Sequence, residues 1–303
     1  MISRLLLVAV PCLGELVAIA PAVADSSGPA LAAYYEQHMA LVDGVAYGWT
    51  ANGDPRELRS GVRQVGVGKD TWYALLDGGT LQRWNTLDGT PTTLMRGVRS
   101  FAAGHSGWFG IDTAGVLWQG TGAGPPQRIA DDVVEASIGD SADYYITRDG
   151  ALWVKGLAHR GQYGDGKLSA TTAFVPTARD VLAVKAHTGH AIHLRRDGVV
   201  MGTGGNRYGP LGNHGLGDKA DRWGPVFDNA VTIATGSRHS AAIRADGSLW
   251  VWGGAFGVTP TKLHEHIAVV AAGDTSTIAR TVDGTLLQWD ASTLPRQIVL
   301  RRK

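Results

Sequence analysis

Apolar and polar positions alternate in short runs along the chain, and the cleanest run reads TGSRHSAAIRADGSLWVWGG. Within it, residues 240–244 and 249–252 have the pattern of two strands joined at Gly247, where glycine supplies the positive φ of a tight hairpin turn. Leu249 and Val251 point to one face of the second strand, and two tryptophans point to the other. Because both faces are apolar, the pattern predicts a strand that is covered on both sides.

The turn glycine of this run occurs seven times, at spacings of 35, 36, 35, 48, 49 and 37 residues, and an apolar residue stands two positions after each copy. Such self-similarity indicates repeated units that bury their faces only against their neighbours. Units of this length that contain strands alone favour a β-propeller, so we predict an all-β fold, a seven-bladed β-propeller. The turn glycines are Gly44, Gly79, Gly115, Gly150, Gly198, Gly247 and Gly284.

The two ends of the chain complement each other in this repeat. An outer strand led by a proline, such as Pro55, precedes most units, but the first unit lacks one within the sequence that export would leave. The same spacing of a proline and an apolar residue appears at Pro295 and Ile298, where the chain stops. We therefore predict that residues 294–300 pair with the N-terminal blade, residues 30–49, and close the ring without an open sheet edge.

Several segments also carry a family resemblance. FAAGHSGWFGIDTAGVLWQG, IATGSRHSAAIRADGSLWVWGG and VAAGDTSTIARTVDGTLLQW resemble the repeat of the regulator of chromosome condensation family, and GLAHRGQYGDG and GGNRYGPLG resemble its inter-repeat segment. The resemblance covers nearly all of the chain after about Ala30 and implies a propeller. It implies no single function, because this propeller serves nucleotide exchange factors, ligase subunits, a photoreceptor and secreted inhibitors.

The N-terminal segment has the layout of a secretory signal peptide. Arg4 precedes an apolar core, and Ala-Val-Ala stands before Asp25. We predict that residues 1–24 are removed by cleavage after Ala24, which leaves residues 25–303 as one secreted or periplasmic propeller domain. A buried strand and a membrane anchor are the alternatives, although a proline and a glutamate interrupt the apolar run. The only cysteine lies in this segment, so the mature chain would form no disulfide.

Charge and motif content narrow the class of function. The chain has 18% charged residues, a net charge of +1 and no basic stripe, so we expect no nucleic-acid binding. The glycine-rich GTGGNRYG has Arg207 where a dinucleotide fingerprint has its third glycine, so no cofactor is expected. No set of Ser, His and Asp shows the geometry that defines a catalytic triad, and no functional metal site is expected. The expected protein is a monomer without enzymatic activity.

Loops at one end of the ring are the candidate binding region. Connections that follow the first strand of each unit should reach one rim, and the longer connections at residues 157–173 and 206–222 should emerge on a common side. We expect these long loops to contribute few buried contacts. A merely hydrated rim is the alternative. The candidates from the rim loops are Tyr34, Tyr35, Lys69, Asp70, Trp72, His105, Trp108, Asp140, Tyr144, His190, Arg238, His239 and Asp274; those from the long loops are Arg160, Tyr163, Arg207, Tyr208, His214 and Trp223.

Repetition separates the tryptophans into two groups. Seven occupy repeat slots and are interpreted as packing between blades, and Trp72, Trp108 and Trp223 fall outside those slots and are interpreted as binding residues. The repeated tryptophans are Trp118, Trp153 and Trp250 in one slot and Trp49, Trp84, Trp252 and Trp289 in the other.

The leading hypothesis is a secreted, non-enzymatic propeller that binds a protein through one rim, as an inhibitor or an interaction scaffold. Within the family the nearest analogy is the secreted bacterial β-lactamase-inhibitor propeller, but only the first unit has aromatic residues immediately after the first strand. One alternative is nucleotide exchange on a small GTPase. Another is a carbohydrate-binding protein or hydrolase that uses the axial channel.

Overall fold

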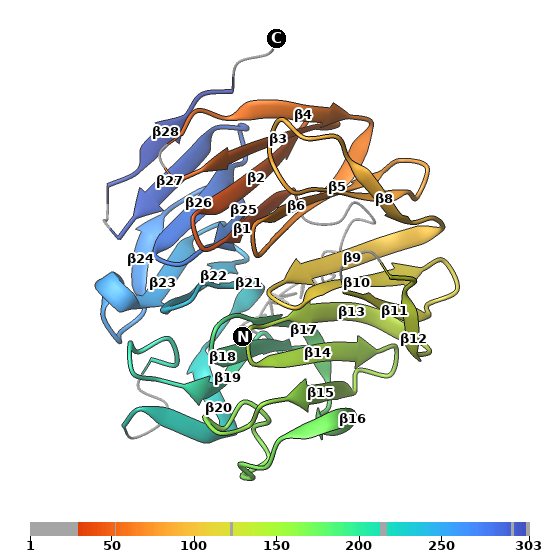
Figure 1. Cartoon of the computed structure of the whole chain (residues 1–303). Coiled ribbons are helices and arrows are strands. Elements are labelled where there is room, and N and C mark those ends of the chain that lie inside the picture. The colour runs from red at the N-terminus through yellow and green to blue at the C-terminus, as the bar shows by residue number, and fades with distance from the viewer. Residues whose placement is uncertain (1–29, 52, 122–123, 213–216, 292–293, 301–303) are drawn as a thin grey trace, which may run out of the picture.

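Seven four-stranded antiparallel sheets surround a central axis (Figure 1). The structure is a computed structural model that describes residues 30–51, 53–121, 124–212, 217–291 and 294–300. Each sheet consists of four consecutive strands, so the predicted all-β, seven-bladed propeller is confirmed. Within the described residues, no helix is long and apolar enough to cross a membrane.

The blades are numbered in chain order. Blade 1 contains β1 (Leu31–Tyr34), β2 (Gln37–Val42), β3 (Val45–Thr50) and β4 (Arg56–Ser60). Blade 2 contains β5 (Val62–Gly68), β6 (Thr71–Leu76), β7 (Leu81–Trp84) and β8 (Thr92–Met95). Blade 3 contains β9 (Val98–Gly104), β10 (Gly107–Asp112), β11 (Leu117–Gly120) and β12 (Gln127–Ala130). Blade 4 contains β13 (Val133–Ile138), β14 (Ala142–Thr147), β15 (Leu152–Gly156) and β16 (Thr171–Ala178).

Blade 5 contains β17 (Val181–Ala186), β18 (His190–Arg195), β19 (Val200–Gly205) and β20 (Lys219–Phe227). Blade 6 contains β21 (Ala230–Thr235), β22 (His239–Arg244), β23 (Leu249–Gly253) and β24 (Thr261–His264), with the 3-10 helix η1 (Gly254–Phe256) between its last two strands. Blade 7 contains β25 (Ile267–Ala272), β26 (Ser276–Thr281), β27 (Leu286–Asp290) and β28 (Arg296–Ile298).

Strand direction places two kinds of connection on one end of the ring. Because neighbouring strands of a blade are antiparallel, the connections from first to second strand and from third to fourth strand share one end, here called the loop face. The first long loop (residues 157–170) and the second long loop (residues 206–218) both join third to fourth strands. The expectation that they emerge on the same side is confirmed.

Repeated tryptophans form the contacts between blades. Trp49, Trp84, Trp252 and Trp289 are at most 3% exposed, and each belongs to a cluster with residues of the preceding blade. Trp49, for example, shares a cluster with Ile278 of blade 7. The interpretation of this slot as interblade packing is confirmed.

The predicted closure of the ring is wrong. Strand β28 pairs with β27 of its own blade, with Ile298 opposite Leu286, and blade 1 receives its outer strand from β4. A proline-led outer strand follows its third strand through a loop on the same edge, so it completes the preceding blade instead of beginning the next one. Every blade is therefore complete by itself, and none of the described strands is exchanged between blades.

Side chains and backbone contacts close the ring instead. Blades 1 and 7 lie side by side (Figure 1), and the buried Ile298 packs in one cluster with Leu31 and Trp49. The Nε2 atom of His38 in blade 1 lies 2.8 Å from the Ser276 hydroxyl of blade 7. The apolar role predicted for Ile298 is confirmed, although its partner in the sheet is not the predicted one.

Candidate partner-binding site

One open pocket of about 250 Å³ lies on the loop face, and loops from five blades line it. It is called the rim pocket below. The first-to-second strand loops of blades 1, 5, 6 and 7 meet there with both long loops. Its lining comprises Tyr35, Arg160, Thr188, Gly189, His190, Gly205, Arg207, Tyr208, Pro210, Ser237, Arg238 and Asp274. Seven of the predicted candidates are therefore brought together at one place.

Arg160 reaches the rim pocket from blade 4 by lying over two glycines of blade 5. A Cβ atom built on Gly189 would lie 3.1 Å from Arg160 Nη1, and one built on Gly205 would lie 3.3 Å from Arg160 Cδ. The backbone N–H of Arg160 donates to Gln162 Oε1 at 2.9 Å. The two glycines thus leave the space through which an arginine of one blade enters the pocket beside the next blade.

Tyr208 stands between two arginines on the wall of the rim pocket. The guanidinium carbons of Arg238 and Arg207 lie 5.1 Å and 5.9 Å from the centre of its ring, distances at which a cation is attracted to an aromatic face. Arg238 also forms a 3.8 Å ion pair with Asp274. Tyr208 is 49% exposed, and with Arg238 it also lines a neighbouring pocket of about 210 Å³ that contains Phe256.

Both long loops are tied to the following blade. In the first long loop, the Gly161 carbonyl accepts a hydrogen bond from Thr203 Oγ1 of blade 5 at 2.8 Å, and the Gln162 carbonyl accepts one from the Tyr144 hydroxyl of the loop's own blade. In the second, the Pro210 carbonyl accepts bonds from Trp252 Nε1 at 2.7 Å and Ser240 Oγ at 2.8 Å, both in blade 6. The expectation that these loops contribute few buried contacts is wrong, and the arginines that they carry are held in place.

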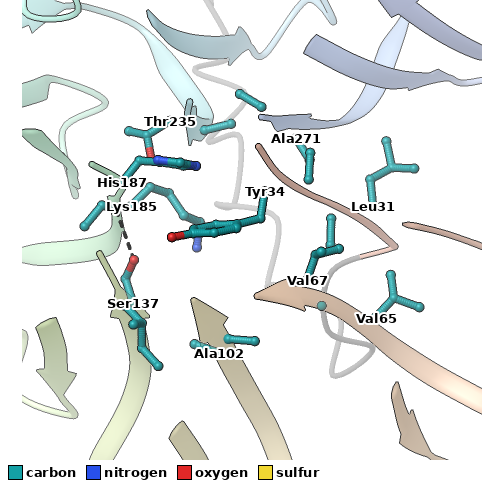
Figure 2. A pocket seen from close by; sticks show the side chains of 18 of the residues that line it. Leu31, Tyr34, Val65, Val67, Ala102, Ser137, Lys185, His187, Thr235 and Ala271 are labelled. Carbon is teal, nitrogen blue, oxygen red and sulfur yellow. Dashed lines mark hydrogen bonds between the residues drawn. The ribbon is translucent and has the colours of Figure 1, made fainter. Parts of the chain in front are cut away.

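Tyr34 lines the axial channel, and its ring points toward His187 (Figure 2). Its hydroxyl donates to one oxygen of Asp140, and the hydroxyl of Tyr35, 38% exposed, donates to the other at 2.9 Å. The Tyr34 ring stacks on His187 with 4.8 Å between ring centres. Burial, reinforced by Asp140, raises the pKa of Tyr34, and burial lowers the pKa of His187 to about 4. Both rings are therefore neutral at pH 7.

The axial channel has a volume of about 190 Å³ and is lined mainly by small and branched apolar side chains, such as Val65 and Ala102 (Figure 2). Some of its polar groups are engaged within the fold, since Lys185 pairs with Glu135 at 2.7 Å and Ser137 Oγ accepts from the Ala186 N–H, whereas His187 Nε2 is buried without a hydrogen-bond partner among the described residues. This lining gives a sugar or a scissile bond few free partners, which disfavours the channel-site hypothesis.

Seven predicted binding residues are buried, and the structure corrects their interpretation as contact residues: Tyr34, Trp72, Trp108, Tyr144, Tyr163, His190 and His239. Most of them lie near strand starts or in loops where side chains fill the space between blades. His190 Nε2 lies 3.2 Å from Ser240 Oγ, for example, so this imidazole faces the next blade even though the residue borders the rim pocket. Trp223 is half-buried and donates from Nε1 to Thr177 Oγ1 at 3.0 Å.

The remaining candidates divide by position. Lys69, Asp70 and His105 are exposed on blades 2 and 3, outside the lining of the rim pocket. His214 lies outside the described residues. Sequence reasoning missed Gly189, Gly205 and Pro210, although GGNRYGPLG marks two of them as a glycine-rich and proline-containing turn. Among the described residues, no group of three or more His, Cys, Asp or Glu side chains could hold a metal ion.

The geometry defines a seven-bladed β-propeller with an open pocket among the loops at one end. The family model described as "Regulator of chromosome condensation (RCC1) repeat" matches residues 230–254, the same run from which the repeat was recognised. This run of the chain therefore matches an RCC1 repeat. The chain is 30% identical over 190 residues to the human E3 ubiquitin-protein ligase HERC2. The match covers 52% of this chain and 4% of HERC2.

Two further comparisons give a distant relative and a similar fold. The ultraviolet-B receptor UVR8 of Arabidopsis thaliana is 28% identical over 184 residues, covering 52% of this chain and 41% of UVR8, so the chain spans less than half the length of these relatives. The crystal structure of Prp20p from Saccharomyces cerevisiae superposes with a TM-score of 0.70 at 17% identity, covering 80% of each chain. At that identity the likeness shows the fold alone.

Proposed function

We propose that this protein is an exported, monomeric, non-enzymatic propeller that binds a protein partner through its loop face. The observation that carries the proposal is the convergence of loops from five blades on one open pocket whose walls present Tyr35, Tyr208 and three arginines. Aromatic and arginine side chains supply most of the binding energy in protein interfaces. The anchored loops support the proposal, because a pre-organised surface loses little conformational entropy on binding.

The comparisons support binding as the class of function. The Prp20p structure was reported with its binding properties to Gsp1p and histones, and a second structure shows yeast RCC1 (Prp20) bound to Kap60. Both describe RCC1 propellers as partners of other proteins. We carry over only that general role, as an inhibitor or an interaction scaffold, and nucleotide exchange stays the alternative.

Export is part of the proposal and has its own test. The charged start, the apolar core and the Ala-Val-Ala sequence before Asp25 support cleavage after Ala24. Intact-mass measurement of protein recovered from outside the cytoplasm should give a chain that begins at Asp25. Recovery of soluble cytoplasmic protein that retains Met1 would contradict export.

Capture of a partner from periplasmic or culture-supernatant protein tests the binding role. We compare wild type with Tyr208→Ala on the loop face and with Val282→Ala, which removes an exposed side chain from the turn between β26 and β27 on the opposite face. Tyr208→Ala should weaken capture at least tenfold, about 1.4 kcal/mol, and Val282→Ala should leave it unchanged. Equal capture by all three proteins would contradict the proposal. Acceleration of nucleotide release from a captured small GTPase would favour the exchange alternative.

A further inference from the structure

We propose that the rim pocket is a receptor for a carboxylate, namely an Asp or Glu side chain of the protein partner, held by Arg160, Arg207 and Arg238. The inference rests on the proposed function and names the chemistry by which the loop face would recognise its partner. Three observations carry it: the charge balance of the pocket, the placement of the arginines and the surroundings of its mouth.

The charge balance leaves the rim pocket positive. Three guanidinium groups line it against a single lining carboxylate, Asp274. Asp274 pairs with Arg238 at 3.8 Å, and neither Arg160 nor Arg207 forms an ion pair with a described residue. Cations held close together repel one another, and an anion between them removes that repulsion. The pocket is therefore complementary to a negatively charged group.

The arginines converge from three blades and are not free to disperse. Arg160 lies over Gly189 and Gly205, and Arg207 and Arg238 flank the ring of Tyr208. A guanidinium presents a planar fork of N–H donors that matches the two oxygens of a carboxylate. Donors that are already positioned lose less rotational freedom when they bind. This arrangement suits a small planar anion better than an anion whose charge is spread over a larger group.

The surroundings favour a protein side chain as the source of the anion. Tyr35, Leu157, Tyr208 and Val258 are exposed on loops of the same face, so apolar contact area surrounds the charged pocket. Arginine and tyrosine side chains ringed by contacts that exclude water are typical of the residues that dominate binding in protein interfaces. A nucleic acid would instead need an extended basic surface, and the whole chain has a net charge of only +1.

Peptide titration tests the chemistry without knowledge of the partner. The probe is an N-acetylated, C-amidated hexapeptide with two adjacent glutamates, compared with the same peptide carrying glutamines and with inorganic phosphate. Calorimetry should show that the glutamate peptide binds at least tenfold more tightly than the glutamine peptide. Added salt should weaken the binding of the glutamate peptide. Stronger binding of phosphate than of the glutamate peptide would overturn the assignment to a carboxylate.

Variants assign the effect to the rim pocket. Arg160→Gln and Arg238→Gln should each weaken binding of the glutamate peptide at least fivefold. Arg128→Gln removes an exposed arginine of β12 that pairs with Asp131, outside the pocket, and should have no effect. Because all three side chains are exposed, circular dichroism should show an unchanged fold. Equal loss in all three variants, or in none, would overturn the inference.

Partner capture separates this inference from the proposed function. If Tyr208→Ala abolishes capture but Arg160→Gln combined with Arg238→Gln does not, the loop face binds a partner and the carboxylate receptor is wrong. If the glutamate peptide binds through the arginines but no protein is captured, the receptor stands and the proposed function fails.

Discussion

In blade 3, the indole of Trp108 occupies the space that a side chain at Gly120 would fill. Gly120 stands five residues after its turn glycine, in the slot where blades 1, 2, 6 and 7 carry tryptophan. It pairs across the sheet with Trp108, whose buried indole fills the space that the slot leaves empty. A Cβ atom on Gly120 would lie 2.1 Å from Trp108 Cε2. The interblade volume is thus conserved while the residue that supplies it changes strand.

Replacement of Gly120 by alanine should destabilise the propeller by about 1–3 kcal/mol or more, because the rigid, buried indole has no space to move. Chemical denaturation of purified protein measures the change. Gly78→Ala is the matched control, because a Cβ atom there meets nothing within 4 Å. An equal effect of both substitutions would show that loss of glycine itself, and not the collision with Trp108, determines the result.

This exchange explains why sequence reasoning misplaced Trp108. The repeat assigned each column its role, and a tryptophan outside the columns was interpreted as a binding residue. Cross-strand pairing puts Trp108 opposite a slot that had lost its own tryptophan, a relation that needs the register. By contrast, Tyr35, Arg207, Tyr208 and Arg238 were predicted correctly as loop-face residues, because turn sequence and polarity determine exposure locally.

Among the elements, the long loops combine two roles, since they carry pocket arginines and join adjacent blades. Tyr163 belongs to the first long loop and is buried. Its hydroxyl donates to the Gly156 carbonyl at 2.7 Å and accepts from the Thr171 N–H at 2.9 Å. These two bonds tie the loop to the ends of β15 and β16, between which it runs.

The substitution Tyr163→Phe should therefore lower stability by about 1 kcal/mol, because a partly buried donor and a partly buried acceptor each lose their partner. Tyr208→Phe is the matched control, since Tyr208 is half exposed and its hydroxyl can be replaced by water. Urea unfolding of both variants measures the difference. If Tyr163→Phe unfolds at the same urea concentration as wild type, the loop is held by its other contacts and this hydroxyl is dispensable.

The position of the long loops could be predicted, but their anchoring could not. Strand alternation alone places both on one face, and their length follows from the spacings of 48 and 49 residues. Their anchors are mostly backbone carbonyls, at Gly161, Gln162 and Pro210, that accept from side chains one strand or one blade away. A backbone carbonyl leaves no residue-specific signal in a sequence. A loop at the surface can therefore also hold blades together.

For the whole molecule, blade number followed from the sequence and ring closure did not. The turn glycines determine the count, because each hairpin needs one residue at positive φ. Ring closure depended on whether a proline-led strand pairs backward or forward along the chain, and the apolar spacing is identical in both cases. Only the hydrogen-bond register shows that β28 pairs with β27.

A series of buried histidines lies across the interfaces of blades 5, 6, 7 and 1. His190 contacts Ser240, His239 contacts Thr277 at 2.9 Å, and His38 contacts Ser276 at 2.8 Å, so each imidazole meets a hydroxyl of the adjacent blade. Burial lowers the pKa to about 4 for His38, His187 and His239 and to about 3 for His190 and His193. A ring closed without strand exchange depends on such contacts, and burial keeps these imidazoles neutral at pH 7.

Stability should therefore decrease as the pH falls from about 6.5 toward 4. The unfolded chain binds protons on these histidines near pH 6.5 and the folded chain only near pH 4, so each histidine lowers the free energy of unfolding by about 1.4 kcal/mol per pH unit in that window. Burial raises the pKa of Asp143 to about 6, which acts in the opposite direction and offsets roughly one histidine.

Urea unfolding at pH 7.5 and pH 5.0 measures the net effect, expected to be a loss of several kcal/mol at the lower pH. His239→Asn should unfold more easily at pH 7.5, because the imidazole no longer fills the interface with Thr277, but it should lose less stability between the two pH values, because one titrating group is gone. His105→Asn, a control at an exposed loop position of blade 3, should change the free energy of unfolding at pH 7.5 by no more than a few tenths of a kcal/mol. A free energy of unfolding that is the same at both pH values would mean that these histidines are protonated, or hydrated, within the folded ring.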